Sequence, residues 1–445
     1  MRVLIFGLGL HGGGVSAALY FISHGHEVRV TDLKSSQQLS SSLDALKGYN
    51  IKYCLEEHRI EDVRWADIII KNPAVPAFLP LLKENGKVFN DIGYFLSHTR
   101  SPIIGVTGSK GKSTTTSLIS HLLRQNGLTT FVGGNIGVSP LNFIDELCST
   151  DSIVLELSSW QIHDLAVHPF RGFQDIIMTP LYHDHQNRYK SFKDYLDDKF
   201  SIFQGEQHTR LAILPLSQKD NGYSVRAKKT FYYTFEDNLP DDCDGVCMFN
   251  KTLRVSKEGN IIYEAQYCAD LSFIPALTYA FASDISPDLI EASIKTYEGL
   301  PHRREIVFTN KITTFINDSA ATIPDAVAFS ISQLEGPINL ITGGTDKELD
   351  PTICIDSIKT CHSVHLLSGS YTEKLIPLLK KNSISFFGPF DSMKEVVFST
   401  KSEMVPGSVI LLSPGASSFE FFDHEFARGD AFKEAVKEIF KEINP

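Results

Sequence analysis

The chain has 445 residues, of which 42% are hydrophobic and 21% are charged, as is typical of a globular protein of about three domains. It has no run of about 18 apolar residues and no signal peptide before its first strand, which argues against a membrane protein and favours a cytoplasmic location. The net charge of −11 argues against nucleic acid as the main partner, because phosphate-backbone binding needs clustered Lys and Arg.

The first segment opens with an apolar strand at residues 2–6, a glycine-rich turn at 7–14 and a helical pattern. A second strand at 27–31 ends at Asp32. A G-x-G-x-x-G turn with an acidic residue about 20 positions further on is the fingerprint of dinucleotide binding. The same turn also serves any nucleotide diphosphate at a helix N-terminus, so the sequence leaves both ligands open.

The second segment carries a phosphate-binding loop. A buried strand runs into Gly108, Gly111, Lys112 and Ser113, and a helix with one apolar face follows. Backbone amides can close around phosphate oxygens, Lys112 can reach the outer phosphates, and Ser113 can bind Mg²⁺. The spacing departs from the common G-x-x-x-x-G-K-[ST] pattern, because Val106 stands where the first glycine is expected. We predict ATP binding rather than a ligand-free glycine turn.

Two strand ends downstream of this loop carry candidate site residues. Glu156 ends an apolar strand, which is where a Mg²⁺ ligand usually follows a phosphate loop, although a solvated strand end would give the same pattern. His183, Asp184 and His185 follow the strand at 174–178 and could bind metal, act as a base or cap a loop. Residues 209–263 are predicted to form strands and turns, and no candidate catalytic or binding residue is identified among them.

The third segment begins after residues 299–303, where Gly and Pro interrupt a helical pattern. Strands are predicted at 312–317, 338–342, 364–367 and 409–412, with helices between them and a final helix from residue 431. All three segments are therefore predicted to be α/β.

An ordered set of motifs makes a family resemblance specific. Beyond the ATP loop, the set comprises residues 133–137, 156–159, 184–185, 299–303, 317–319, 343–347 and 412–415. Through these motifs nearly the whole chain resembles the Mur ligases. The resemblance implies three domains: a Rossmann-like UDP-binding domain (1–98), a central P-loop ATPase domain with a mainly parallel sheet (99–302), and a Rossmann-like domain that brings the amino acid and closes over ATP (303–445).

Among Mur ligases the chain looks most like those that add D-glutamate to UDP-N-acetylmuramoyl-L-alanine in peptidoglycan synthesis, a pathway that cell shape and division depend on. The resemblance implies an ATP-dependent acid–amino-acid ligase, working as a monomer on small molecules through an acyl phosphate. One alternative is a ligase of the same architecture that adds L-glutamate or another amino acid. An alternative of a different class is a nucleotide-sensing binding protein.

The resemblance also implies the following site residues. For ATP they are Gly108, Ser109, Lys110, Gly111, Lys112, Ser113, Thr114, Arg303 and Asp318. For the UDP substrate they are Gly9, Leu10, His11, Asp32, Asn72, Asn135, Ser158, Ser159 and Gln161. For the amino acid they are Thr322, Lys347, Ser418 and Phe419. For two Mg²⁺ ions they are Ser113, Glu156, His185 and Lys199, the last as a carbamate. The catalytic residues would be Lys112, His185, Lys199 and Arg303.

The third segment departs from the family pattern near the amino-acid site. Ala320 replaces a lysine, Ile323 replaces an asparagine, and Glu425 stands where a phenylalanine is common. The Thr-x-Pro element at 322–324 also occurs in related ligases that add L-glutamate, whereas Lys347 favours the D-glutamate type.

Overall fold

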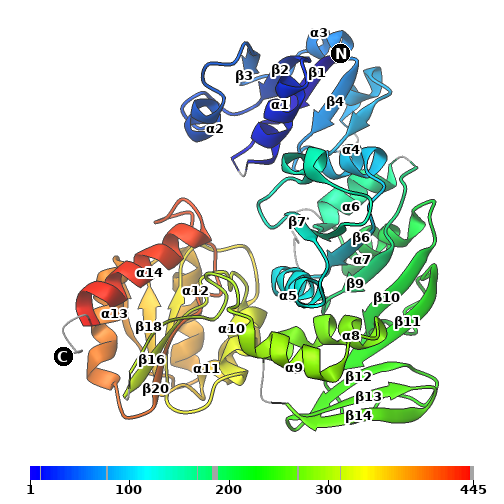
Figure 1. Cartoon of the computed structure of the whole chain (residues 1–445). Helices are drawn as coiled ribbons and strands as arrows, with labels where there is room; N and C mark the ends of the chain where they lie inside the picture. The colour runs from blue at the N-terminus through cyan, green and yellow to red at the C-terminus, as the bar shows by residue number, and fades with distance from the viewer. Residues whose placement is uncertain are drawn as a thin grey trace. The chain divides into compact units, whose positions relative to one another are not determined.

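The computed structural model describes residues 1–10, 12–76, 79–167, 169–182, 189–267, 270–310 and 312–440. The chain forms two compact units, Met1–Tyr297 and Glu298–Pro445. The first unit contains two β-sheets and the second contains one (Figure 1). Most strand pairs are parallel and helices connect them, so the predicted α/β class is confirmed. The three-domain boundaries at 98/99 and 302/303 stay predictions.

The N-terminal sheet has five parallel strands in the order β3-β2-β1-β4-β5. They are β1 (Arg2–Phe6), β2 (Glu27–Asp32), β3 (Lys52–Leu55), β4 (Ile68–Lys71) and β5 (Val88–Phe89), with helices α1 (Gly13–Ser23), α2 (Ser40–Ala45), α3 (Ile60–Trp65) and α4 (Asp91–His98). The strand order reverses between β1 and β4. Ligands of doubly wound sheets bind at the carboxyl ends of such strands, where the turns after β1 and β4 lie.

The second sheet has nine strands in the order β14-β13-β12-β11-β10-β9-β6-β8-β7. They are β6 (Ile103–Thr107), β7 (Thr130–Gly134), β8 (Ser152–Glu156), β9 (Asp175–Met178), β10 (Thr209–Pro215), β11 (Ala227–Thr234), β12 (Gly245–Phe249), β13 (Thr252–Lys257) and β14 (Asn260–Gln266). The strands from β7 to β12 pair in parallel, and β13 and β14 add two antiparallel hairpins.

Helices cover both faces of this sheet. They are α5 (Lys112–Gln125), α6 (Ser159–Ala166), α7 (Phe192–Phe200), α8 (Ile274–Ala282) and α9 (Pro287–Thr296). One face packs its apolar residues against α5, α8 and α9, and the other packs against α4 and α6. Strand β6 is buried at every position, which explains its uninterrupted apolar sequence.

The second unit is a three-layer sandwich around six strands in the order β15-β16-β20-β17-β18-β19, in which only β15 is antiparallel to its neighbour. The strands are β15 (Glu305–Thr309), β16 (Thr313–Asn317), β17 (Ile338–Gly343), β18 (Ser363–Leu367), β19 (Phe387–Phe390) and β20 (Ser408–Leu412), and the helices are α10 (Pro324–Ser332), α11 (Ile355–Ile358), α12 (Ser370–Lys381), α13 (Met393–Ser399) and α14 (Glu425–Phe440). Helices α13 and α14 cover one face, and α10, α11 and α12 cover the other.

The final helix begins at Glu425, so its predicted start at residue 431 is wrong. Local propensity disfavours a helix that contains Gly429, because glycine is about 1 kcal/mol less favourable than alanine inside a helix. The position needs a glycine for packing: a Cβ there would lie 2.2 Å from Nδ1 of His302. Tertiary contact therefore overrides helix propensity. Across the residues that the structure describes, no helix is long and apolar enough to cross a bilayer.

Candidate active site

The predicted phosphate loop joins β6 to α5 in a conformation that needs glycine at two positions. Gly108 has φ +145°, and a Cβ there would lie 2.0 Å from the hydroxyl oxygen of Thr179. Gly111 has φ +84° and occupies the N-cap of α5, where no side chain caps the first turn. The first N–H groups of a helix have no partner within it, so these amides suit phosphate oxygens.

Two lysine side chains converge on this loop. Nζ of Lys112 donates to the carbonyl oxygens of Gly108 at 3.1 Å and Ser109 at 3.0 Å. Nζ of Lys199, which α7 carries, donates to the Gly108 carbonyl at 2.8 Å and to the Thr107 hydroxyl at 3.3 Å, and its side chain is fully buried. Both predicted catalytic lysines therefore lie beside the backbone of the phosphate loop.

The other loop residues follow the same arrangement. Ser109 is buried, and its hydroxyl lies 2.8 Å from the hydroxyl of Tyr195 on α7. Lys110 and Thr114 are half-buried. The Ser109–Tyr195 contact therefore fastens the loop to the helix that carries Lys199.

The buried carboxylate of Glu156 accepts hydrogen bonds from two of the predicted site residues. The Ser113 hydroxyl donates to Oε2 of Glu156 at 2.6 Å, and Nδ2 of Asn135 donates to Oε1 at 2.9 Å. Glu156 ends β8 and is 2% exposed. Carboxylate and hydroxyl oxygens are the ligands that Mg²⁺ prefers in proteins, so Ser113 and Glu156 fit a magnesium ion that accompanies a nucleotide.

Two predicted site residues, His11 and His185, lie outside the described residues. Leu10, which precedes the first of them, is 48% exposed. Within the described part of the chain, no group of three or more His, Cys, Asp or Glu side chains could hold a metal ion. The predicted ligand set is built differently, because it combines Glu156 with the hydroxyl of Ser113, with His185 and with a carbamylated Lys199.

The glycine turn after β1 is closed by polar contacts. The backbone N–H of Gly9 donates to Oδ2 of Asp32 at 3.0 Å, and that of Lys34 donates to Oδ1 at 2.9 Å. Ser42 donates to the Gly9 carbonyl at 2.8 Å. A Cβ on residue 9 would lie 2.6 Å from Nδ2 of Asn72, so the turns after β1 and β4 touch. Asp32 and Asn72, predicted to bind the UDP substrate, therefore flank the same turn.

The remaining substrate residues of the first unit lie at the start of α6. Ser158 and Gln161 form a capping box: the Ser158 hydroxyl accepts from the Gln161 N–H at 3.2 Å, and the Gln161 side chain accepts from the Ser158 N–H at 2.9 Å. The Ser159 hydroxyl is buried and has no hydrogen-bond partner among the described residues. Ser158 and Gln161 thus have a structural task, whereas the hydroxyl of Ser159 remains available to a ligand.

One cavity of about 280 Å³ joins these groups. It is lined by Gly13, Asn72, Pro73, Ala74, Asp91, Gly108, Lys112, Gly134, Asn135, Gly137, Ser139, Ser158, Ser159, Trp160, Gln161 and Lys199. Residues predicted for the UDP substrate, for ATP and for metal therefore meet in one space, at the carboxyl ends of β4, β6, β7 and β8.

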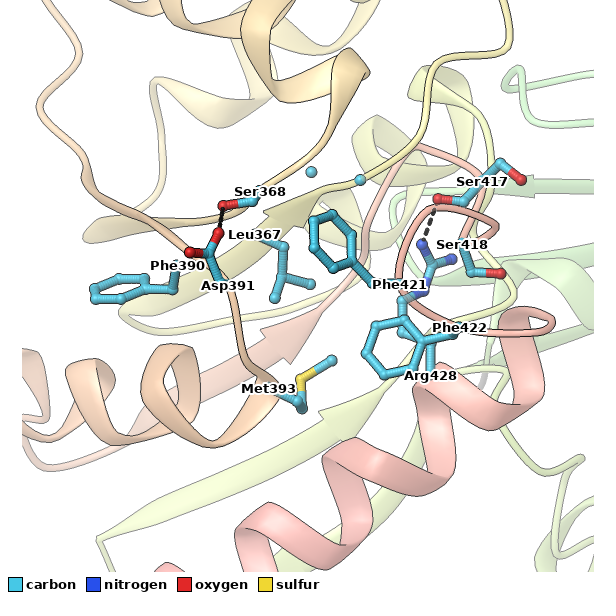
Figure 2. A pocket seen from close by; sticks show the side chains of 12 residues that line it. Leu367, Ser368, Phe390, Asp391, Met393, Ser417, Ser418, Phe421, Phe422 and Arg428 are labelled. Atoms are coloured by element: carbon cyan, nitrogen blue, oxygen red, sulfur yellow. Dashed lines mark hydrogen bonds between the residues drawn. The ribbon is translucent and has the colours of Figure 1, made fainter.

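The predicted amino-acid residues lie in the second unit. Nζ of Lys347 donates to the Thr322 hydroxyl at 3.2 Å. The Ser418 hydroxyl is buried and has no hydrogen-bond partner within the described chain, while Phe419 is 66% exposed. Figure 2 shows Ser418 beside a small cavity that Leu367 and three phenylalanines also line. The structure thus brings Thr322 and Lys347 together.

Asp318 and Arg303 lie near the start of the same unit. Asp318 is buried and accepts hydrogen bonds from the hydroxyls of Ser330 at 2.6 Å and Ser413 at 3.2 Å. Burial raises the pKa of its carboxyl to about 6. The backbone N–H of Arg303 donates to the carbonyl of Leu300, and the Arg303 side chain is half-buried. A role for either residue toward ATP stays a prediction.

Arg428 is a supporting residue that the sequence analysis did not identify. Its guanidinium donates to the hydroxyl and carbonyl of Ser319 and to the carbonyls of Ala416 and Ser417, at 2.9–3.1 Å. Its side chain is 1% exposed, and burial lowers its pKa to about 10. Figure 2 shows it beneath the turn that carries Ser418. Its position on α14 gave no local signal, because the helix was expected to begin after it.

Comparison with known proteins gives a consistent result. The sequence profile of the Mur ligase middle domain matches residues 106–256. UDP-N-acetylmuramoylalanine–D-glutamate ligase of Borreliella afzelii is 37% identical over 98% of this chain and 97% of that protein. The enzyme of the same name from Treponema pallidum is 31% identical over 99% of this chain and 98% of its own length.

Solved structures share the fold. UDP-N-acetylmuramate–alanine ligase MurC from Thermotoga maritima matches with a TM-score of 0.62 at 18% identity, over 99% of this chain and 100% of that one. MurF ligase from the same organism, solved with ADP, matches with a TM-score of 0.61 at 14% identity, over 94% and 96%. The predicted family and type of enzyme are confirmed, and the chain belongs to the Mur ligases, a family of ATP-dependent amide ligases.

Proposed function

We propose that this protein joins D-glutamate to UDP-N-acetylmuramoyl-L-alanine at the expense of ATP, as a step in peptidoglycan precursor synthesis in the cytoplasm. The observation that carries the proposal is the single cavity lined by Asn72, Asn135, Lys112 and Lys199. The full-length similarity to ligases of that name supports the choice of substrates. The enzyme would act as a monomer.

The chemistry follows from the groups in the cavity. A carboxylate is a poor electrophile, so one acceptor oxygen first attacks the γ-phosphorus of ATP, which forms an acyl phosphate and releases ADP. The amine of glutamate then attacks the acyl carbon, loses a proton and expels phosphate. Such transfers are catalysed mainly by positioning and charge neutralisation. The first-turn amides of α5 and Lys112 would hold the phosphates, and Arg303 would reach the γ-phosphate.

Magnesium would add positive charge beside the transferred phosphate. Ser113 and Glu156 would hold one ion, and His185 with a carbamylated Lys199 would hold a second. The burial of Lys199 and its contact with the Gly108 carbonyl at 2.8 Å support its assignment to the site. Carbamylation would turn its amine into an anion that can bind a cation.

The second unit would supply the amino-acid site. Lys347 and Thr322, which are in contact at 3.2 Å, would bind one glutamate carboxylate. The Ser418 hydroxyl, which has no partner among the residues that the structure describes, would contact the substrate nearby together with Phe419. A cation and hydroxyls suit a carboxylate of either enantiomer. L-glutamate is therefore the alternative amino acid, in keeping with the Thr-x-Pro element at 322–324.

The test is phosphate release from ATP with the acceptor and each glutamate enantiomer, with the product identified by mass. We expect phosphate and a ligated product only when acceptor and D-glutamate are both present. Product with L-glutamate alone would move the assignment to the alternative amino acid. Hydrolysis that is indifferent to both substrates would refute the ligase reaction and favour a nucleotide-sensing protein.

A further inference from the structure

A buried ion pair joins strand β4 to helix α6 beside the cavity. Nζ of Lys71 lies 2.8 Å from Oδ2 of Asp164, and the two side chains are 3% and 4% exposed. Burying two charges is costly, and replacing such a pair by apolar residues is often neutral or stabilising. Fold stability alone is therefore a weak reason for this pair.

The ammonium of Lys71 also holds the turn after β4. It donates to the carbonyl oxygens of Asn72 at 3.1 Å and Val75 at 2.7 Å, in addition to its ion pair with Asp164. Asn72, Pro73 and Ala74 of this turn line the cavity. The Lys71 ammonium thus contributes two hydrogen bonds to the turn that forms one cavity wall.

The carboxylate of Asp164 lies on the helix whose first turn forms another part of the cavity wall. Helix α6 begins at Ser159, and its first turn lines the same cavity. Asn90 reinforces this side, because its Nδ2 donates to the carbonyl of Gln161 at 3.1 Å and lies 3.5 Å from Oδ2 of Asp164. The preceding residue on the helix, His163, pairs with Asp198 at 2.7 Å and so ties α6 to the helix that carries Lys199.

We propose that Lys71 and Asp164 are positioning residues that fix the turn at 72–75 against α6 and thereby set the affinity for the UDP-linked acceptor. The inference rests on the proposed function, since the acceptor is the ligand whose site the two walls form. Neither side chain is needed in contact with the substrate. Their effect passes through the carbonyls of Asn72 and Val75 on one side and through α6 on the other.

The decisive variant is Lys71→Met/Asp164→Leu, which removes both charges without leaving one buried alone. Binding of UDP-N-acetylmuramoyl-L-alanine is measured by calorimetry without ATP, and the KM values for acceptor and ATP, kcat and Tm are measured in parallel. We expect the acceptor Kd and KM to rise about tenfold, as the loss of hydrogen bonds from a charged group implies. The KM for ATP and kcat should stay within about twofold of wild type.

A control away from the cavity is the ion pair of Arg210 with Asp175, 2.5 Å apart, at the amino ends of β10 and β9, in which the carboxylate is buried and the arginine is 47% exposed. Arg210→Met/Asp175→Leu should change Tm without changing the acceptor Kd. If the Lys71 double variant does not fold, Lys71→Met/Asp164→Asn takes its place with the same expectation.

Each outcome bears on a different claim. An unchanged acceptor Kd in a folded Lys71 variant would overturn the positioning role. Equal losses of acceptor and ATP affinity, or a matching loss in the Arg210 control, would do so as well, because they would indicate general destabilisation. Wild-type protein that binds the acceptor but forms no product would refute the proposed function and leave the Kd comparison decisive for the ion pair. Wild-type protein that does not bind the acceptor would overturn both.

Discussion

Replacing Arg428 by methionine should destabilise the second unit and weaken its amino-acid site. Methionine keeps much of the apolar volume but has no donor for the hydroxyl and carbonyl of Ser319 or for the carbonyls of Ala416 and Ser417. A buried acceptor left unsatisfied costs about 1–3 kcal/mol, and the carbonyls keep a second lone pair, so the lower end applies to each. The four acceptors together cost roughly 4–5 kcal/mol.

Removing a buried cation offsets part of this cost. Burial is the main cause of the lowered pKa of Arg428, so burying its charged guanidinium costs part of the free energy of folding. We expect a net loss of roughly 2–4 kcal/mol in the free energy of unfolding, which for a unit of this size lowers Tm by roughly 6–15 °C. The KM for glutamate should rise, because the turn that carries Ser418 loses its support.

The measurement is thermal unfolding followed by circular dichroism, with initial rates at varied glutamate. Lys433→Met on the same helix is the control: its ion pair with Glu305 at 2.9 Å is partly exposed and should contribute less than about 1 kcal/mol. An Arg428→Met protein whose Tm lies within about 2 °C of wild type would refute the claim that these hydrogen bonds hold the turn.

Four further variants test other parts of the site. Lys112→Ala should keep the fold and lower kcat for phosphate release by about a hundred- to a thousandfold, and near-normal turnover would remove this lysine from the phosphate site. Lys199→Ala should be inactive and partly restored by a short-chain carboxylic acid; activity without the acid would argue against a carbamate. Arg303→Ala should mainly lower kcat, and an unchanged kcat would separate it from the γ-phosphate. Because burial raises the folded-state pKa of Asp318 to about 6, the native state binds this proton more tightly than the unfolded chain, and stability falls as pH rises from about 4 to about 6. Asp318→Asn should therefore unfold at a higher temperature than wild type above pH 6, and this difference in Tm should vanish below about pH 4. A difference in Tm that stays constant between pH 4 and pH 6 would contradict the raised pKa of Asp318.

Local patterns predicted the fold well because most of its elements are specified by neighbouring residues. Strands β6 and β8 have apolar centres, since both their faces are buried. Strand β6 ends at the predicted phosphate loop, and β8 ends with the predicted Glu156. The glycines at 108 and 111 are needed for backbone conformation, which is a local property. Carboxyl ends of parallel strands share one edge of a sheet, so the contact of Ser113 with Glu156 at 2.6 Å follows from topology.

The features that the sequence did not predict depend on contacts between distant segments. Gly429 lies inside α14 because the ring of His302 leaves no room for a Cβ. Arg428 has no charged partner among its four acceptors, so no pattern of opposite charges along the chain could have identified it.

Lys71 illustrates why such cases resist prediction. A lysine at the end of an apolar strand is usually exposed to solvent. The local sequence around such a lysine does not distinguish this case from a buried ion pair. Its partner Asp164 follows a histidine on a short helix, a position that is equally ordinary. Only the packing of α6 against β4 brings the charges to 2.8 Å, with both side chains at most 4% exposed. There the same two residues can hold the turn at 72–75 against α6.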